Sequence, residues 1–142
     1  MKVKDIMSSK IVSVTPEESA SVAARLLARH NIGALPVCSK DGRLRGMVTD
    51  RDIVLRCVAA DEEPSGVKIA EIMTRRVIAV GAEDSVERAT DLMAHEQIRR
   101  LPVQSNGKVV GMLSLCDLAK LPNYSAEFSQ TLCEISSNLK FL

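Results

Sequence analysis

The chain of 142 residues contains the same pattern twice, and this duplication restricts the possible fold more than any other feature of the sequence. Both copies contain the string Leu-Pro-Val, at Pro36 and at Pro102, which sets an offset of 66 residues. After Asp41 the offset is 65, because the second copy lacks one residue there, and Gly46-Met47 then matches Gly111-Met112. The other matched pairs include Ile6-Met7 with Ile72-Met73, Val14 with Val80, Ser19 with Ser85, Leu26 with Leu92, and Asp52 with Asp117. Matches in one order at spacings of 66 and then 65 residues indicate a tandem duplication, so the chain must fold as two similar repeats.

Each repeat is predicted to contain a strand, a helix, two strands joined by a hairpin, and a second helix. Thr15-Pro16-Glu17-Glu18 has the form of a capping box with proline at the first helical position, and apolar residues follow at helical spacing. Asp41-Gly42 and Asn106-Gly107 are typical of tight hairpin turns. In the first copy the expected strands are Lys10–Val14, Ala34–Cys38 and Leu44–Val48, with a final helix from Asp50; in the second they are Arg76–Val80, Leu101–Gln104 and Val109–Leu113, with a final helix from Leu115. The sequence therefore predicts an α+β fold made of two β-α-β-β-α repeats.

We place the first repeat at residues 1–62, the second at 63–122, and a C-terminal tail at 123–142. A unit of about 60 residues buries too little surface to be firmly stable alone, so we expect the repeats to pack around a pseudo-two-fold axis with two similar clefts. Apolar residues of the tail recur at helical spacing and predict an amphipathic helix. They are Tyr124, Phe128, Leu132, Ile135 and Leu139. This helix could pack on its own core or cover a partner subunit, and the sequence leaves both possibilities open.

Charge and hydropathy exclude nucleic acid and membranes as partners. The 19 basic and 18 acidic residues are nearly balanced, and the three aromatic residues are too few to stack nucleic-acid bases. No apolar run approaches the 18 or so residues that span a bilayer, and no signal peptide is visible, so we expect a cytoplasmic protein. The four cysteines, Cys38, Cys57, Cys116 and Cys133, lie far apart in the sequence. We expect reduced, mostly buried thiols rather than a disulfide or a metal site.

No constellation of catalytic residues is recognisable. The two histidines, His30 and His95, do not occupy equivalent positions in the two copies, and both fall near expected helix C-termini, where a cation is favoured. The sequence has no phosphate-binding glycine loop, no zinc-protease motif and no serine–histidine–aspartate set. We therefore expect a protein that is not an enzyme and that requires neither a metal nor a cofactor.

A hydroxyl residue followed three residues later by aspartate comes after the last strand of each copy. The two strings are Thr49-Asp50-Arg51-Asp52 and Ser114-Leu115-Cys116-Asp117. One interpretation is structural: the hydroxyl caps a helix and the acid stands in its first turn. The other is a ligand site, because a helix N-terminus attracts phosphate and a carboxylate can accept both hydroxyls of a ribose. The same geometry serves both, so the two interpretations are compatible.

These strings and the segments before them resemble a tandem pair of CBS domains, the module named after cystathionine β-synthase. The resemblance covers roughly residues 1–121. It is carried by Ile6-Met7, Ile11–Val14, His30–Val37 and Gly46–Asp52 in the first copy, and by Ile72-Met73, Val77–Val80, Glu96–Val103 and Gly111–Asp117 in the second. It implies a regulatory module, commonly a homodimer, that binds adenosine-containing ligands such as AMP, ADP, ATP, NAD or S-adenosylmethionine in clefts between the repeats.

The resemblance also implies roles for individual residues. Asp52 and Asp117 would hold ribose hydroxyls, and Thr49 and Ser114 would bond phosphate or ribose. The adenine would be lined by Val12, Val14, Ile32, Ala34 and Pro36 in one copy, and by Ile78, Val80, Ile98 and Pro102 in the other. Gly33-Ala34 of the first copy is replaced by Arg99-Arg100 in the second. Arginine forms bidentate bonds with phosphate, so a phosphate contact and a solvated strand edge are equally good explanations of Arg99 and Arg100.

A sensor of adenine nucleotides is the function that the sequence favours, because both copies keep the hydroxyl-x-x-Asp string. The alternative is a ligand-free homodimer that docks on an unidentified protein partner. Nucleotide bound to the purified protein would separate the two hypotheses.

Overall fold

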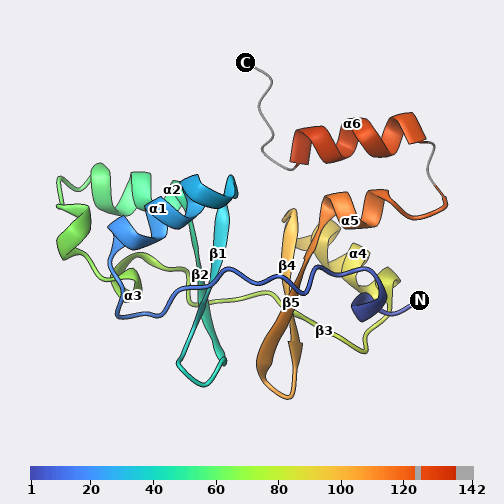
Figure 1. Ribbon diagram of the computed structural model, residues 1–142, viewed down its shortest axis with the longest axis horizontal. Coiled ribbons are helices and arrows are strands. Elements are labelled where there is room, and N and C mark those ends of the chain that lie inside the picture. The colour runs from blue at the N-terminus through green and yellow to red at the C-terminus, as the bar shows by residue number, and fades with distance from the viewer. Residues whose placement is uncertain (124–125, 137–142) are drawn as a thin grey trace. The chain divides into compact units, whose positions relative to one another are not determined.

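The computed structural model describes residues 1–123 and 126–136 of the chain and has the α+β fold that the sequence predicts (Figure 1). The polypeptide divides into two compact units. One is continuous, Val12–Val77, and the other combines Met1–Ile11 with Ile78–Leu142. Each unit therefore contains most of one repeat together with the leading segment of the other.

The continuous unit is built on a two-stranded antiparallel sheet. β1 (Ala34–Cys38) pairs with β2 (Leu44–Thr49). α1 (Ala20–His30) precedes this hairpin, and α2 (Asp50–Ile53) follows it and continues into a π-helical turn, Val54–Val58. A 3-10 turn (Pro64–Gly66) and α3 (Ile69–Ile72) come next. The core is aliphatic and includes Val14, Leu27, Leu35, Val37, Val48, Ile53, Ile69 and Ile72.

The second unit repeats this arrangement. β3 (Val80–Gly81) runs parallel to β4 (Arg100–Ser105), which pairs antiparallel with β5 (Lys108–Ser114). α4 (Val86–Glu96) precedes β4, α5 (Leu115–Ala119) follows β5, and α6 (Ala126–Ser136) lies along α5 (Figure 1). A 3-10 turn at Val3–Asp5 takes the place of α3. The core includes Val3, Val80, Val86, Met93, Leu101, Val103, Leu113 and Leu118.

The leading segments of the two repeats are exchanged, and equivalent hydrogen bonds hold them in both units. The Val3 N–H donates to Asp84 O at 2.9 Å, and the Ile69 N–H, 66 residues later, donates to Glu18 O at 2.8 Å. In each case the first residues of one repeat bond to the residues just before the first helix of the other. Val3 and Ile69 are both fully buried, so the exchanged segments supply part of each core.

A second contact of the same kind joins each exchanged segment to a strand. Ser8 and Met112 exchange two backbone hydrogen bonds of 2.9 Å. Thr74 and Met47 exchange the equivalent pair, of 2.8 and 3.0 Å. Each methionine follows the glycine that recurs in both copies, which leaves room for the second backbone to approach.

The first strand expected in each copy is mostly absent, which corrects the sequence-based prediction. In place of a strand over Lys10–Val14, only Val14 forms a bridge, with Val37. In place of Arg76–Val80, the strand is the two-residue β3. The physical reason is the exchange: the residues just before these stretches pair with the other repeat, so only the ends of the stretches reach their own sheet. The predicted positions of the remaining strands and of the final helices are confirmed to within one residue.

α1 begins at Ala20 rather than at the expected capping box, Thr15–Glu18. Its cap is Ser19, whose hydroxyl accepts a hydrogen bond of 3.3 Å from the Val22 N–H. The residues of the expected box form a turn in which the Glu18 N–H donates to Thr15 O, and their carbonyls accept hydrogen bonds from the exchanged segment. Ser85 caps α4 in the same way as Ser19 caps α1.

The expectation of four reduced thiols is wrong for two of them. Cys116 of α5 and Cys133 of α6 form a disulfide, with their Cα atoms 4.5 Å apart. Helix α6 folds back along α5 and brings together two residues that are 17 positions apart, which the sequence spacing alone does not reveal. Cys38 and Cys57 are free and buried, as expected.

The amphipathic helix predicted for the tail is present as α6. Of the five apolar residues that predict it, Tyr124 and Leu139 lie outside the described residues, and Leu132 is half-buried. Across residues 1–123 and 126–136, no helix combines the length and the apolar character needed to cross a membrane.

Candidate functional site

Thr49 and Asp52 form a capping box at the start of α2. The Asp52 N–H donates to Thr49 Oγ1 at 3.0 Å, and the Thr49 N–H donates to Asp52 Oδ2 at 2.9 Å. These bonds satisfy two backbone donors that a helix start leaves without partners. The structural interpretation of the string is therefore confirmed in the first copy.

Ser114 and Asp117 form the equivalent box at the start of α5. The Asp117 N–H donates to Ser114 Oγ at 3.2 Å, and the Ser114 N–H donates to Asp117 Oδ2 at 2.8 Å. Here the serine hydroxyl also lies 3.0 Å from Oδ2 and donates its proton to it. Among the described residues Thr49 has no such acceptor, so the two hydroxyl groups differ in how readily they can donate to a ligand.

Both boxes leave acceptor capacity on the aspartate. The capping bonds of Asp52 and Asp117 use Oδ2 alone. An ionised carboxylate offers about four acceptor positions on its two oxygens. Oδ1 of each aspartate can therefore accept a hydrogen bond from a hydroxyl donor without loss of the cap.

Arg56 adjoins the first box and was not identified from the sequence. Its Nη1 donates to Ile72 O at 3.0 Å and lies 3.9 Å from Oδ1 of Asp52, whose side chain is 14% exposed. The sequence contains the signal, because Asp52 and Arg56 are four residues apart and such pairs meet on a helix surface. Arg56 therefore places a positive charge beside Oδ1 of Asp52, the oxygen that the cap does not use, and ties the turn after α2 to the exchanged segment.

The neighbouring strand brings further candidate residues to the first box. Ala34 lies directly opposite Thr49 in the β1–β2 pair, and the Asp50 N–H donates to Gly33 O at 3.1 Å. The structure thus places the Gly33-Ala34 dipeptide beside the hydroxyl end of the string.

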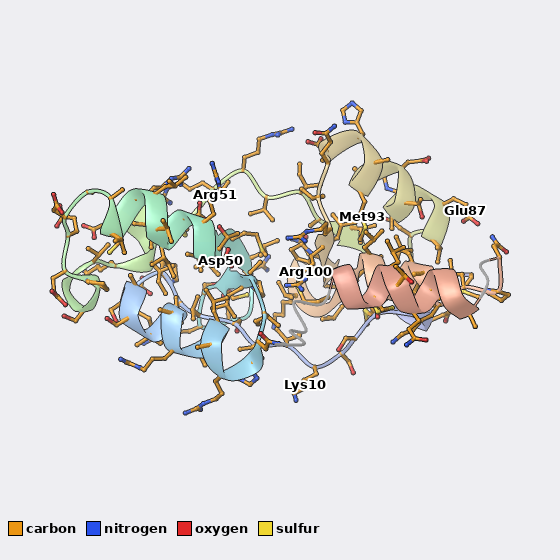
Figure 2. The ribbon with its side chains drawn as sticks, turned by 90° about the horizontal axis from the view of Figure 1, so that it is seen from above. Lys10, Asp50, Arg51, Glu87, Met93 and Arg100 are labelled. Atoms are coloured by element: carbon orange, nitrogen blue, oxygen red, sulfur yellow. A yellow bond between two sulfur atoms is a disulfide. The ribbon has the colours of Figure 1, made fainter. Side chains whose placement is uncertain are left out.

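In the second unit the same two positions hold arginine. Arg100 lies opposite Ser114 in the β4–β5 pair, and the Leu115 N–H donates to Arg99 O at 2.9 Å. Residues directly opposite in an antiparallel pair share a face of the sheet, so Arg100 and Ser114 project from the same face. Arg99 is exposed, and Arg100, labelled in Figure 2, is half-buried.

The apolar candidate residues separate into buried and partly exposed sets, and equivalent residues behave alike in the two copies. The buried set is Val14, Pro36, Val80 and Pro102. The partly exposed set, which packs at the margin of each core, is Val12, Ile32, Ile78 and Ile98. Side chains of the second set are the ones with surface available to a ligand.

The candidate residues fall into two groups, one in each unit. The continuous unit holds Val12, Val14, Ile32, Ala34, Pro36, Thr49 and Asp52, and the other holds Ile78, Val80, Ile98, Arg99, Arg100, Pro102, Ser114 and Asp117. In each group the hydroxyl-x-x-Asp string and the preceding hairpin come together around one helix N-terminus. The duplication in sequence is therefore a duplication of local geometry.

The histidines occupy the positions expected for them. His30 is the last residue of α1, and His95 lies in the last turn of α4, with its Nδ1 3.5 Å from Oε1 of Glu96. Over the described ranges, no group of three or more histidine, cysteine, aspartate or glutamate residues is arranged to hold a metal ion.

Comparison with known proteins agrees with this geometry. The family model of the CBS domain matches residues 3–58 and, a second time, residues 69–123. The chain belongs to the CBS domain family. As a tandem CBS pair it contains both matched domains within 123 residues, and the matches begin at the exchanged segments. Proteins built on CBS pairs are in general regulatory.

Three proteins illustrate the similarity. Hypoxic response protein 1 of Mycobacterium tuberculosis is 36% identical over 132 residues, which are 92% of each chain. The crystal structure of that protein, with two coordinated zinc ions, matches this one with a TM-score of 0.80. The match covers 86% of this chain and all of that chain. CBS domain-containing protein YhcV of Bacillus subtilis is 40% identical over 126 residues, 87% of this chain and 89% of that protein. The CBS domain pair of protein MJ0100, in complex with 5′-methylthioadenosine and S-adenosyl-L-methionine, has a TM-score of 0.73 at 31% identity, covering 84% of this chain and 94% of that one.

Proposed function

We propose that this CBS pair is a cytoplasmic regulatory module that binds adenosine-containing ligands, one site in each unit, and is not itself an enzyme. The observation that carries the proposal is the duplicated box, in which one aspartate oxygen caps the helix and the other can accept a ribose hydroxyl. The similar CBS pair of protein MJ0100 was crystallised with two adenosine compounds, which supports this ligand class.

The proposed pose follows from the chemistry around each box. The ribose hydroxyls would donate to Oδ1 of Asp52 or Asp117, and the adenine would lie against the partly exposed aliphatic side chains. In the continuous unit these are Val12 and Ile32. A phosphate would lie near the backbone N–H groups at the helix start in either unit. In the second unit Arg99 and Arg100 would add positive charge beside Ser114.

Titration calorimetry with AMP, ADP, ATP, NAD and S-adenosylmethionine tests the proposal. The variants are Asp52→Asn and Asp117→Asn, because an asparagine oxygen can still accept the capping bond while the charged acceptor is lost. A hydrogen bond to a charged group contributes about 1.5–3 kcal/mol, so each variant should weaken its own site about tenfold or more. Each single variant should leave one site intact, and the double variant should lose both.

Ser19→Ala is the matched control. It removes a helix cap of the same kind, with an expected cost of about 1 kcal/mol, at a position outside both strings. Its affinity for the ligands should equal that of the wild type. If none of the five ligands binds at millimolar concentration, or if the double asparagine variant binds them as well as the wild type does, the ligand proposal is wrong.

The second candidate function, docking as a homodimer, has its own observation. Val54, Leu55 and Val58 are 54%, 51% and 56% exposed on the turn that follows α2. Grouped apolar side chains on a surface mark interaction sites. We infer that a second copy of the chain covers them, and light scattering at micromolar concentration should report a dimer that Leu55→Asp weakens. A monomeric wild type would remove this inference.

A further inference from the structure

The disulfide lies on the helix that opens with the second box. Cys116 stands between Ser114 and Asp117, as the second residue of α5, and Cys133 belongs to α6. A second contact joins the same two helices, since the Ser129 hydroxyl donates to Ala119 O. Both cysteines are only partly buried.

The first repeat has a helix equivalent to α5, and its face can be compared with the face of α5 that α6 covers. At the offset of 65, Cys116 corresponds to Arg51 and Ala119 to Val54. Ala119 is 1% exposed, whereas Val54 is 54% exposed. Arg51, labelled in Figure 2, is exposed at the start of α2. α6 therefore covers on α5 a face whose counterpart, on α2 and the π-helical turn after it, remains open.

The two remaining cysteines, Cys38 and Cys57, are less exposed to solvent than Cys116 and Cys133. Cys57 is completely buried and Cys38 is 7% exposed. Burial raises the pKa of the Cys38 thiol, which lowers the fraction of reactive thiolate. Reagents in solution therefore meet Cys116 and Cys133 and not the other two.

We propose that Cys116 and Cys133 are a redox-active pair, a site of thiol–disulfide exchange that fixes α6 over α5 when oxidised and frees it when reduced. The reductant is a small thiol or a dithiol protein. Its thiolate attacks one sulfur of the pair and forms a mixed disulfide, and its second thiolate, or a second molecule, displaces the remaining cysteine. Two electrons pass to the pair, each cysteine sulfur takes up one proton, and the reductant leaves as its own disulfide.

Release of α6 on reduction follows from the short length of this helix. The helix has 11 residues, a length at which an isolated helix is marginal in water. Once the covalent link is cut, only non-covalent contacts hold the helix, and among the described residues these include the hydrogen bond of Ser129 and the half-buried Leu132. The reduced helix should therefore open far more often than α4, whose residues Val86, Ala89 and Met93 are buried in the core.

The test measures hydrogen exchange of the full chain after equilibration in oxidised and in reduced glutathione. Peptides covering Ala126–Ser136 should exchange at least tenfold faster in the reduced protein, and peptides from α4 should not change. Alkylation followed by intact-mass measurement should add no label to the oxidised protein and two labels to the reduced protein under native conditions. Returning the reduced protein to oxidised glutathione should restore the slow exchange.

The Cys116→Ser, Cys133→Ser double variant is the matched control. It should exchange fast at α6 in both buffers, while its circular dichroism shows the rest of the chain folded. Equal exchange of α6 in oxidised and reduced wild type would overturn the proposal. So would a pair that fails to form a disulfide in oxidised glutathione, or one that cannot be reduced in the native protein.

Discussion

Replacing Gly46 by alanine should break the contact between β2 and the exchanged segment. An ideal Cβ at Gly46 would lie 2.6 Å from the backbone oxygen of Thr74 and 3.1 Å from Sδ of Met73. Ordinary contact begins at 3.4 Å, so the two backbones would have to separate by about 0.8 Å. The methionine side chain can move aside, but the Thr74 oxygen is part of the backbone pair and cannot.

The size of the effect follows from what this separation disrupts. Met47 and Thr74 exchange hydrogen bonds of 3.0 and 2.8 Å, and moving the backbones apart by 0.8 Å takes both beyond bonding distance. Each bond contributes about 1 kcal/mol. Overpacking that the chain relieves only in part costs about 1–3 kcal/mol. Together these terms lower the expected free energy of unfolding by about 3–5 kcal/mol.

Urea denaturation followed by circular dichroism measures this loss. Gly66→Ala is the matched control, because an ideal Cβ there meets no atom within 4 Å. Its unfolding free energy should stay within about 0.5 kcal/mol of the wild type. Gly111→Ala should behave like Gly46→Ala in the other unit, since its Cβ would lie 2.8 Å from Ser8 O. If Gly46→Ala is as stable as Gly66→Ala, the argument from close backbone approach is refuted.

Two further predictions concern charged side chains. Hydrogen bonds from Lys2 and Lys4 lower the pKa of Glu83 to about 2, so the ion pair stabilises the fold above the ordinary glutamate pKa of 4.5 and the stability is lost as the pH falls towards 2. The urea midpoint of Glu83→Gln should therefore vary less with pH than that of the wild type between about pH 4.5 and 2. This difference should shrink in high salt, because the ion pair is exposed. Midpoints of the two proteins that change in parallel with pH would contradict the prediction. If Arg99 and Arg100 bind phosphate, replacing both by alanine should reduce the affinity for AMP about tenfold or more while leaving that for adenosine unchanged. Calorimetry that finds equal losses for the two ligands would assign the arginines to folding or shape instead.

Several local elements could be predicted because their signals lie within a few adjacent residues. The hairpin turns at Gly42 and Gly107, with φ of 87° and 78°, follow from the Asp-Gly and Asn-Gly pairs. The boxes at Thr49 and Ser114 follow from a hydroxyl residue three positions before an aspartate. Such features depend on one turn of backbone, so the surrounding structure has little power to change them.

The disulfide and the cap of α1 depended on contacts between distant residues. Thr15 has a good capping sequence, but the carbonyls around it accept hydrogen bonds from Ile69 and Ala70, and the helix begins at Ala20 with Ser19 as its cap. Cys116 and Cys133 meet only because α6 folds back along α5. In α1, hydrogen bonds with residues far along the chain outweigh the local capping preference.

The duplication determined by itself that the molecule contains two similar units, because residues matched in the same order along both copies must make matched contacts. It could not determine which repeat each leading segment joins. Ile6-Met7 and Ile72-Met73 have the same sequence, so the sequence does not distinguish which of the two repeats each segment packs against. The tertiary structure decided for exchange, with Ser8 bonded to Met112 and Thr74 bonded to Met47. Chain connectivity and long-range packing make that choice, and neither is expressed in the residues of a single repeat.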